Sequence, residues 1–311
     1  MPVIDLPMPF VLLMLAIVAV WLPALKTPWG WTLPPWLVLY AAATALAVAQ
    51  GYVDAVGVLS LVGLVLLAEG LRRKPPAPLY RPLYRPLHWP LLVALSLLAV
   101  ALSLHGVPGF RNPVAINAVR FSDDARPFTQ YLNFDKGSVG LVLMALLAPR
   151  LQSGDRVGRV LMRSAALAVV VAFFALSLAL LLGMVRPDPK WPPQTVQFLV
   201  TNLLLTCVAE EALFRVMVQD TLARGTGASG SSTVGPWRVR ALVAPGVSAL
   251  LFGAAHAGGG PSMVAVATVA GVGYAAAYRW QRRIEAAVLL HFAVNALHFL
   301  LFTYPGKAPG A

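Results

Sequence analysis

Residues 195–222 read TVQFLVTNLLLTCVAEEALFRVMVQDTL, an apolar stretch with two adjacent glutamates near its middle. The stretch is longer than the ~20 residues that a helix needs to cross a bilayer. A carboxylate inside a membrane is costly, so it faces the interior of a helix bundle or a wet cavity and has a partner. The stretch therefore predicts a membrane-spanning helix in which Glu210 and Glu211 are paired or functional.

The rest of the chain repeats this apolar pattern. Of its 311 residues, 59% are hydrophobic and 12% are charged, and the mean hydropathy is +0.74. A soluble domain of this size would carry about twice that charged fraction. We predict an all-α fold, a polytopic transmembrane bundle of about ten helices, with eight or nine as the alternative count. The ten apolar segments are residues 8–25, 35–50, 53–71, 89–105, 137–149, 161–185, 195–222, 239–257, 261–279 and 284–304.

The net charge of +12 reflects topology rather than nucleic-acid binding. Most of the 24 Lys and Arg residues fall in the connections that follow odd-numbered segments. Because positive residues mark the cytoplasmic side, we expect these connections in the cytoplasm and the N-terminus outside. We expect an integral membrane protein surrounded by a lipid bilayer and no nucleic-acid partner. A composition rich in Ala, Leu, Val, Gly, Pro and Arg suggests a bacterial inner (cytoplasmic) membrane.

Helical phase separates the two glutamates. Glu211 and Arg215 are spaced i, i+4 with the acid first, which is the favourable order, so we read them as a structural pair. Glu210 points about 100° away around the helix and has no partner on its own helix or nearby. Cys207, one turn before Glu210, is expected to be a packing residue.

Other polar residues inside apolar segments follow downstream. The stretch FGAAH places His256 near the end of the eighth segment, and HFAVNALH places His291, Asn295 and His298 on one helical face of the tenth. Polar side chains on facing transmembrane helices can be simple hydrogen-bonding groups. Together with an unpaired glutamate, they favour a catalytic site.

Hydrolysis is the chemistry that fits this set. A buried glutamate can take a proton from water and return it to a leaving amine. A histidine and an asparagine amide can orient that water or stabilise an oxyanion. Alternatively, Glu210, His256 and His291 can hold zinc, which activates its bound water. The sequence contains neither HExxH nor GxSxG, and the choice between zinc and no cofactor stays open.

Three motifs in order now suggest a family. Glu-Glu-x-x-x-Arg at 210–215, Phe-x-x-x-His at 252–256 and His-x-x-x-Asn at 291–295 resemble the CPBP intramembrane proteases. That family includes the type 2 CAAX-prenyl endopeptidases and the bacterial Abi proteins. The resemblance covers about residues 195–300. We therefore expect a CPBP-like catalytic core at 195–304, preceded by an N-terminal transmembrane extension at 1–190 with an outer loop at 106–136.

The resemblance implies an intramembrane endopeptidase that cuts a membrane-embedded or membrane-associated protein or peptide. Glu210 would be the water-activating base, with His256, His291 and Asn295 completing the site. The family mechanism is glutamic-type or metal-dependent, and Asn295, a poor zinc ligand, favours the former. His298 lies outside the motif and is read as structural or supporting. The alternatives are a non-catalytic scaffold or bacteriocin-immunity protein of the same fold, and a proton-relaying transporter.

The depth of His256 sets a condition on the fold. At 1.5 Å per residue, an unbroken eighth helix would carry His256 roughly 18 to 22 Å from the cytoplasmic side, past mid-membrane. Glu210, His256 and His291 can then meet only if that helix is tilted or ends early. The stretch AGGGP at 257–261 predicts a short or broken helix at Gly258–Pro261, the alternative being an ordinary tight outer turn.

Overall fold

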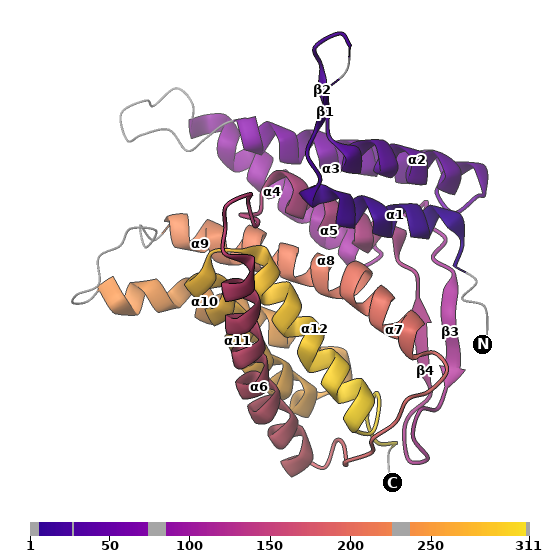
Figure 1. The fold of residues 1–311 in the computed structure, drawn as a ribbon, viewed down its shortest axis with the longest axis vertical. Coiled ribbons are helices and arrows are strands. Elements are labelled where there is room, and N and C mark those ends of the chain that lie inside the picture. The colour runs from indigo at the N-terminus through magenta and orange to yellow at the C-terminus, as the bar shows by residue number, and fades with distance from the viewer. Residues whose placement is uncertain (1–5, 27, 74–84, 226–236, 309–311) are drawn as a thin grey trace.

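The computed structural model describes residues 6–26, 28–73, 85–225 and 237–308, and these fold into the predicted all-α bundle (Figure 1). The N-terminal helices are α1 (Met8–Val18), α2 (Pro35–Ala49), α3 (Ala55–Arg73), α4 (Arg85–Ser103), α5 (Phe134–Leu146) and α6 (Val157–Leu181). A continuous helical stretch from Thr195 to Gly225 follows, and then α10 (Trp237–Ala254), α11 (Pro261–Gln281) and α12 (Ile284–Leu301). These helices correspond to the ten predicted segments.

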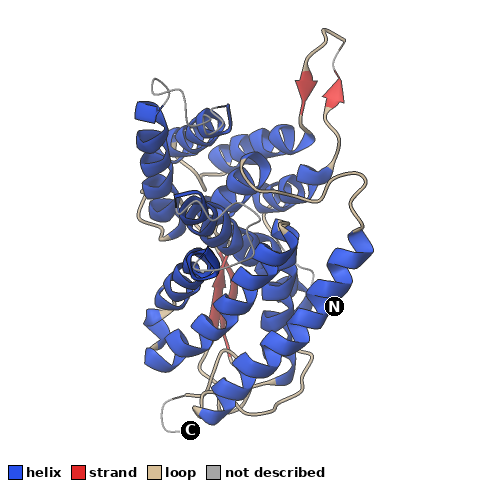
Figure 2. Ribbon diagram, turned by 90° about the vertical axis from the view of Figure 1, so that its left-hand side faces the viewer, coloured by secondary structure: helices blue, strands red, loops and turns tan. Residues whose placement is uncertain are grey.

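Two short antiparallel hairpins interrupt the helices. Strands β1 (Leu25–Lys26) and β2 (Thr32–Leu33) pair after α1. Strands β3 (Val114–Val119) and β4 (Phe128–Tyr131) pair within the predicted outer loop, with irregular register. In Figure 2 the β1–β2 hairpin projects from the helices at the top of the view and β3 and β4 lie among the helices, so the strands leave the fold class unchanged.

Length and apolar character identify an integral membrane protein. Among the described residues, five helices are long and apolar enough to span a bilayer: Ala55–Arg73, Val157–Leu181, Thr195–Arg224, Pro261–Gln281 and Ile284–Leu301. Four shorter apolar helices accompany them, at Met8–Trp21, Pro35–Ala49, His88–Ser103 and Leu242–Ala254. Large apolar side chains such as Leu59, Val169 and Leu181 are exposed on these helices. Exposed apolar surface on this scale is what a lipid-facing bundle presents.

Among the described connections, those after the first, fifth and ninth segments lie at one end of the bundle. Arg150, after α5, donates to the carbonyl oxygen of Val20 at 2.6 Å. Arg283, after α11, forms a two-bond ion pair with Asp155, both bonds at 2.8 Å. At the opposite end, Pro187 forms a bridge with Phe302. The connections at 74–84 and 226–236, whose basic residues contributed to the topology prediction, lie outside the described residues.

Helix α5 is the centre of the bundle. Residues 137–145 are all buried, and the helix packs against α1, α3 and α4 and also against the helical stretch that carries the glutamates (Figure 1). Helix α6 packs along α11 and α12. The division between an extension at 1–190 and a core at 195–304 stays a prediction, and helices from the two parts are in direct contact.

The glutamate-bearing helix is not a uniform α-helix. It consists of α7 (Thr195–Thr201), a π-helical segment η3 (Asn202–Cys207), one α-helical turn α8 (Val208–Glu211), a second π-helical segment η4 (Ala212–Gln219) and α9 (Asp220–Gly225). Segments of π-helix are rare and occur frequently at functional sites. Both glutamates lie on the single α-helical turn between them.

The chain leaves the α-helical conformation before Pro261, an arrangement common to the predicted break and to its alternative, a tight turn between two helices. Helix α10 ends at Ala254, and a 3-10 turn η5 (Ala257–Gly259) leads to α11, which begins at Pro261. Gly260 has a φ of 84°, a conformation that L-residues with a side chain rarely adopt. His256 therefore lies beyond the end of α10.

Candidate active site

Glu211 and Arg215 form a fully buried ion pair. Arg215 Nε lies 2.7 Å from Glu211 Oε2, and both side chains are 0% exposed. Arg215 Nη1 also donates to Ser248 Oγ on α10 at 2.9 Å, and Ser248 donates to the carbonyl oxygen of Phe214. Ser248 thus bonds the pair to α10. A buried charge needs such a set of partners, because an unpaired one costs several kcal/mol.

The second oxygen of Glu211 holds His291. Its Oε1 lies 2.9 Å from His291 Nδ1, and the His291 ring stacks on Tyr274 of α11 with ring centroids 4.6 Å apart. A carboxylate on one ring nitrogen fixes the orientation of an imidazole and directs the other nitrogen. Here the other nitrogen, Nε2, faces Glu210. Glu211 therefore orients the α12 histidine as well as pairing with Arg215.

Glu210 has a partner that the sequence did not suggest. Lys136, in the first turn of α5, places Nζ 2.7 Å from Glu210 Oε1. As expected, no residue close in sequence pairs with Glu210; its partner Lys136 lies 74 residues away along the chain, which is why helical spacing did not reveal it. The one available signal was a lysine directly before a short apolar segment, where a charge entering a bundle needs an opposite charge.

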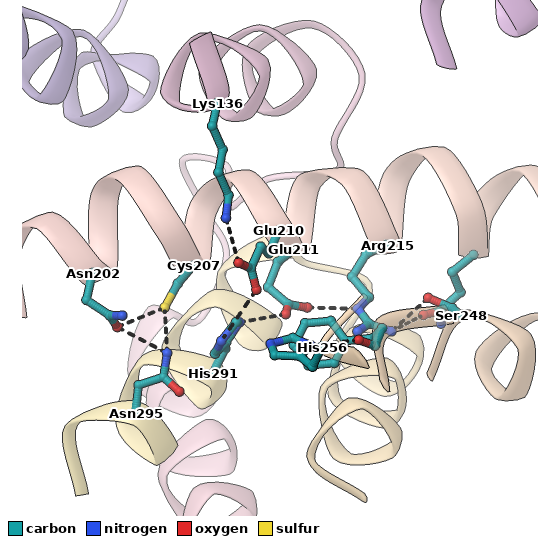
Figure 3. Close-up of polar contacts among 12 residues, drawn as sticks. Lys136, Asn202, Cys207, Glu210, Glu211, Arg215, Ser248, His256, His291 and Asn295 are labelled. Atoms are coloured by element: carbon teal, nitrogen blue, oxygen red, sulfur yellow. Dashed lines mark hydrogen bonds and ion pairs between the residues drawn. The ribbon is translucent and has the colours of Figure 1, made fainter. Parts of the chain in front are cut away.

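The other oxygen of Glu210 faces His291. Glu210 Oε2 lies 4.0 Å from His291 Nε2, too far for a direct hydrogen bond. The Glu210 side chain is 17% exposed, whereas that of Glu211 is 0% exposed. Figure 3 shows Lys136 reaching Glu210 from one side of the helix and His291 approaching from the other. The two glutamates thus differ in access: Glu211 is enclosed, while Glu210 is partly open.

His256 joins this neighbourhood through Phe252. Its Nδ1 lies 2.8 Å from the carbonyl oxygen of Phe252. Since a carbonyl can only accept, Nδ1 carries the hydrogen and Nε2 remains available. The Phe252 ring contacts the rings of both His256 and His291, with centroid distances of 4.8 and 5.5 Å. The two histidines therefore flank one aromatic side chain.

Asn295 is held by a residue that sequence reasoning missed. Its Nδ2 donates to Asn202 Oδ1 at 3.2 Å and lies 3.8 Å from Cys207 Sγ. Asn202 is 7% exposed and opens the first π-helical segment. Figure 3 shows these three side chains together on the His291 side of the helix. His298 lies near the far end of α12, where Nε2 is 3.2 Å from the carbonyl oxygen of Thr303.

The proposed zinc ligands do not form a metal-binding group. In the part of the chain that the structure describes, no three His, Cys, Asp or Glu side chains are placed to hold one ion. Glu210 Oε1 faces the Lys136 ammonium group, and His256 Nδ1 faces a carbonyl oxygen. The bonds at Nδ1 leave Nε2 of both histidines free, but the Lys136 ammonium group beside Glu210 repels a second cation. The arrangement of the described side chains therefore does not fit zinc.

Together these features define a class of protein: an α-helical integral membrane protein with a carboxylate–histidine–amide site inside its bundle. Residues 192–297 match the family model described as "Type II CAAX prenyl endopeptidase Rce1-like". The resemblance inferred from the three motifs is confirmed over these residues. The matched family is a family of proteases, which supports hydrolase activity. Searches of curated proteins and of solved structures gave no match.

Proposed function

We propose that the protein is an intramembrane endopeptidase that hydrolyses a peptide bond in a membrane-embedded or membrane-associated protein or peptide. Glu210 is the base that activates water. The observation that carries this proposal is the position of its carboxylate. Glu210 is partly open and faces His291 Nε2 across 4.0 Å, whereas the adjacent Glu211 is enclosed and fully bonded.

The 4.0 Å separation suits a bridging water. Polar atoms that lie beyond direct hydrogen-bonding distance are commonly joined through one. Glu210 would take a proton from this water as its oxygen attacks the carbonyl carbon of the substrate. The carbon–nitrogen bond then breaks, and the proton held by Glu210 passes to the leaving amine. The products are a carboxylic acid and an amine, and Glu210 returns to its starting state.

His256, His291 and Asn295 complete the site in this proposal. His291 Nε2 orients the water opposite Glu210. Asn295 keeps one amide hydrogen on Asn202 Oδ1, and its contact with Cys207 Sγ at 3.8 Å is weak because sulfur is a poor acceptor. Its second amide hydrogen can therefore turn to a developing oxyanion. His256 can donate to the same oxygen from Nε2 when protonated.

A comparison of membrane proteomes tests the activity. Cells carrying the wild-type protein are compared with cells carrying Glu210→Gln and with a matched control, Glu69→Gln. Glu69 is a carboxylate at the end of α3 whose ion pairs are with Arg72 and Arg73. We expect at least one membrane protein or peptide to accumulate uncut with Glu210→Gln and to be processed with Glu69→Gln. Unchanged processing with Glu210→Gln at equal abundance would instead favour a non-catalytic scaffold or immunity protein.

We also propose that the protein resides in a bacterial inner membrane with its N-terminus outside. The cluster of connections around Arg150, Arg283 and Asp155 would then face the cytoplasm, as the positive-inside rule requires. Single cysteines introduced into the β1–β2 hairpin and into the β3–β4 loop can be labelled in intact cells with an impermeant maleimide. We expect labelling in the β3–β4 loop. Labelling in the β1–β2 hairpin instead would mean that the protein has the opposite orientation in the membrane.

A further inference from the structure

The ion pair between Lys136 and Glu210 joins the two parts of the chain at the candidate site. Residues 192–297 match the protease family, whereas Lys136 lies well before them. The Lys136 and Glu210 side chains are 19% and 17% exposed, and their charged atoms are 2.7 Å apart. A long lysine side chain seldom enters a bundle to this depth without an opposite charge. Two features therefore matter for this contact: what holds Lys136 in place on α5, and which other charges surround Glu210.

A polar network fixes the first turn of α5. Asp135 is 1% exposed, and its Oδ1 accepts from Asn112 Nδ2 at 3.0 Å and from the backbone N–H of Lys136 at 2.8 Å. Its Oδ2 lies 2.7 Å from His105 Nδ1. Asn112 in turn accepts from the backbone N–H of Phe134. The N–H groups at a helix start lack partners within the helix, so side-chain acceptors of this kind hold the start in place.

A close helix contact brings the same turn next to Glu210. Gly140 lies one turn beyond Lys136 on α5 and touches the backbone of Ala209, the residue before Glu210. A Cβ added to Gly140 would lie 2.7 Å from Ala209 Cα and 2.9 Å from Ala209 N. Small residues allow this approach between membrane helices. The position of Lys136 is thus determined from both sides, by its anchored helix start and by the Gly140 contact.

The other charged groups around Glu210 do not replace this lysine. Glu211, its neighbour on the same helix, is a like charge and is paired with Arg215. His291 from α12 is bonded to Glu211, and His256 beyond α10 is bonded to a backbone carbonyl. Two adjacent carboxylates disfavour each other's ionisation, and a nearby cation favours it. A general base must be ionised to accept a proton.

We propose that Lys136 is a positioning residue of this site: its ammonium group holds Glu210 as an ionised, oriented carboxylate. The inference rests on the proposed role of Glu210 as the base. It extends the site into residues 1–190, which supply the cation, while the family-like part supplies the base, the histidines and the amide. Lys136 acts through Glu210 and is not itself a group that touches the scissile bond.

Carbodiimide labelling tests this inference without a substrate. Dicyclohexylcarbodiimide reacts with protonated carboxyl groups in apolar surroundings, and mass spectrometry of peptides reports the adduct at each glutamate. An opposite charge within 4–6 Å changes the protonation equilibrium of a carboxyl by about 10- to 1,000-fold. We therefore expect Glu210 to be labelled at least about tenfold faster in Lys136→Met than in the wild-type protein at neutral pH.

Three further variants make the labelling specific. Lys136→Arg restores a cation and should keep Glu210 resistant. Lys136→Gln removes the charge while retaining a polar side chain, and it serves if Lys136→Met does not fold. Lys190→Met removes another partly buried lysine, which pairs with Asp188 away from the site, and should leave the labelling of Glu210 unchanged. Equal labelling of Glu210 in wild type, Lys136→Gln and Lys136→Arg would overturn the proposal.

Cleavage of the peptide that accumulates with Glu210→Gln separates this inference from the proposed function. If Glu210→Gln abolishes cleavage, we expect Lys136→Met to lower kcat by about tenfold or more with little change in KM, and Lys136→Arg to recover most of the loss. Full activity in Lys136→Met would overturn the role of the charge, and so would an equal loss of activity in Lys136→Met and Lys136→Arg. If Glu210→Gln still cleaves, the proposed function fails, and the labelling result alone decides whether Lys136 controls the protonation of Glu210.

Discussion

Gly140 of α5 lies directly against the backbone of Ala209 of α8, at a distance that leaves no room for a side chain. The contact joins the central helix to the turn that carries both glutamates. Because the neighbouring atoms on Ala209 are backbone, the clash from any added Cβ cannot be relieved by a rotamer change.

The first prediction concerns this contact. Gly140→Ala should destabilise the protein by about 1–3 kcal/mol, because overpacking a tight interface forces a backbone shift. Gly246→Ala is the matched control: Gly246 lies inside α10 with open space around it, and Ala is favoured over Gly in a helix by about 0.5–1 kcal/mol. Thermal unfolding of the purified proteins in detergent measures both. A Gly140→Ala protein as stable as Gly246→Ala would contradict the close contact.

The second prediction separates the two glutamates by stability. Glu211→Gln leaves Arg215 charged and unpaired in a fully buried place, which should cost about 3–5 kcal/mol. Glu210→Gln breaks a pair whose side chains keep some exposure, 19% for Lys136 and 17% for Glu210, so it should cost clearly less than Glu211→Gln. Melting temperatures in one detergent would reveal the order. Similar losses in the two variants would mean that the glutamates are not differently buried.

The third prediction concerns Asn202, whose Oδ1 holds the amide of Asn295. Asn202→Ala removes one partner of this buried hydrogen bond, which costs about 1–3 kcal/mol, and freeing Asn295 should lower the cleavage rate by about tenfold. Gln197→Ala is the control, since Gln197 lies on the same helix and bonds the carbonyl oxygen of Ala115 in the β3–β4 region. Cleavage assays of the two variants against wild type check this, and equal rates in all three would exclude a role for Asn202.

The fourth prediction concerns how stability depends on pH at the end of the bundle where Asp155 pairs with Arg283. The Arg283 guanidinium lowers the pKa of Asp155 from 3.8 to about 2. A carboxyl whose folded-state pKa is depressed stabilises the fold above its unfolded pKa and loses that contribution as the pH falls through its folded pKa. The melting temperature of Asp155→Asn should therefore be below that of wild type at pH 6 and converge with it between about pH 4 and pH 2. A constant difference across this range would mean that the pair is not formed.

The fifth prediction concerns metal. Since no three His, Cys, Asp or Glu side chains are placed to hold one ion in the described part of the chain, and the Lys136 ammonium group lies beside Glu210, we expect purified protein to contain well below one zinc per chain. Chelator treatment should leave the cleavage rate unchanged. Stoichiometric zinc, with activity lost on chelation and restored by zinc, would establish the metal-dependent alternative.

Much of the fold follows from local sequence features. Apolar segments long enough to cross a membrane predicted the helices, and the i, i+4 spacing predicted the ion pair between Arg215 and Glu211. The glycines before Pro261 indicated where the eighth helix ends, and His256 lies beyond that end. Each of these depends on residues a few positions apart, where chain geometry determines what is adjacent.

The part of the site that sequence reasoning missed depends on contacts between residues far apart in the sequence. Lys136 meets Glu210 only because α5 lies at the centre of the bundle, and no spacing within either segment encodes that. Asn202 was overlooked because the helical phase of α7 changes where the π-helical segments begin. The pattern thus identified helices and motifs, whereas the contacts between helices required the three-dimensional structure.

The two ion pairs at the site also have an electrical consequence. Lys136 with Glu210 and Arg215 with Glu211 give two positive and two negative formal charges, which sum to zero. A transmembrane voltage does work of about 2.3 kcal/mol per elementary charge per 100 mV on any net charge that moves through it. Because this set is electroneutral, changes in membrane potential exert almost no net force on it.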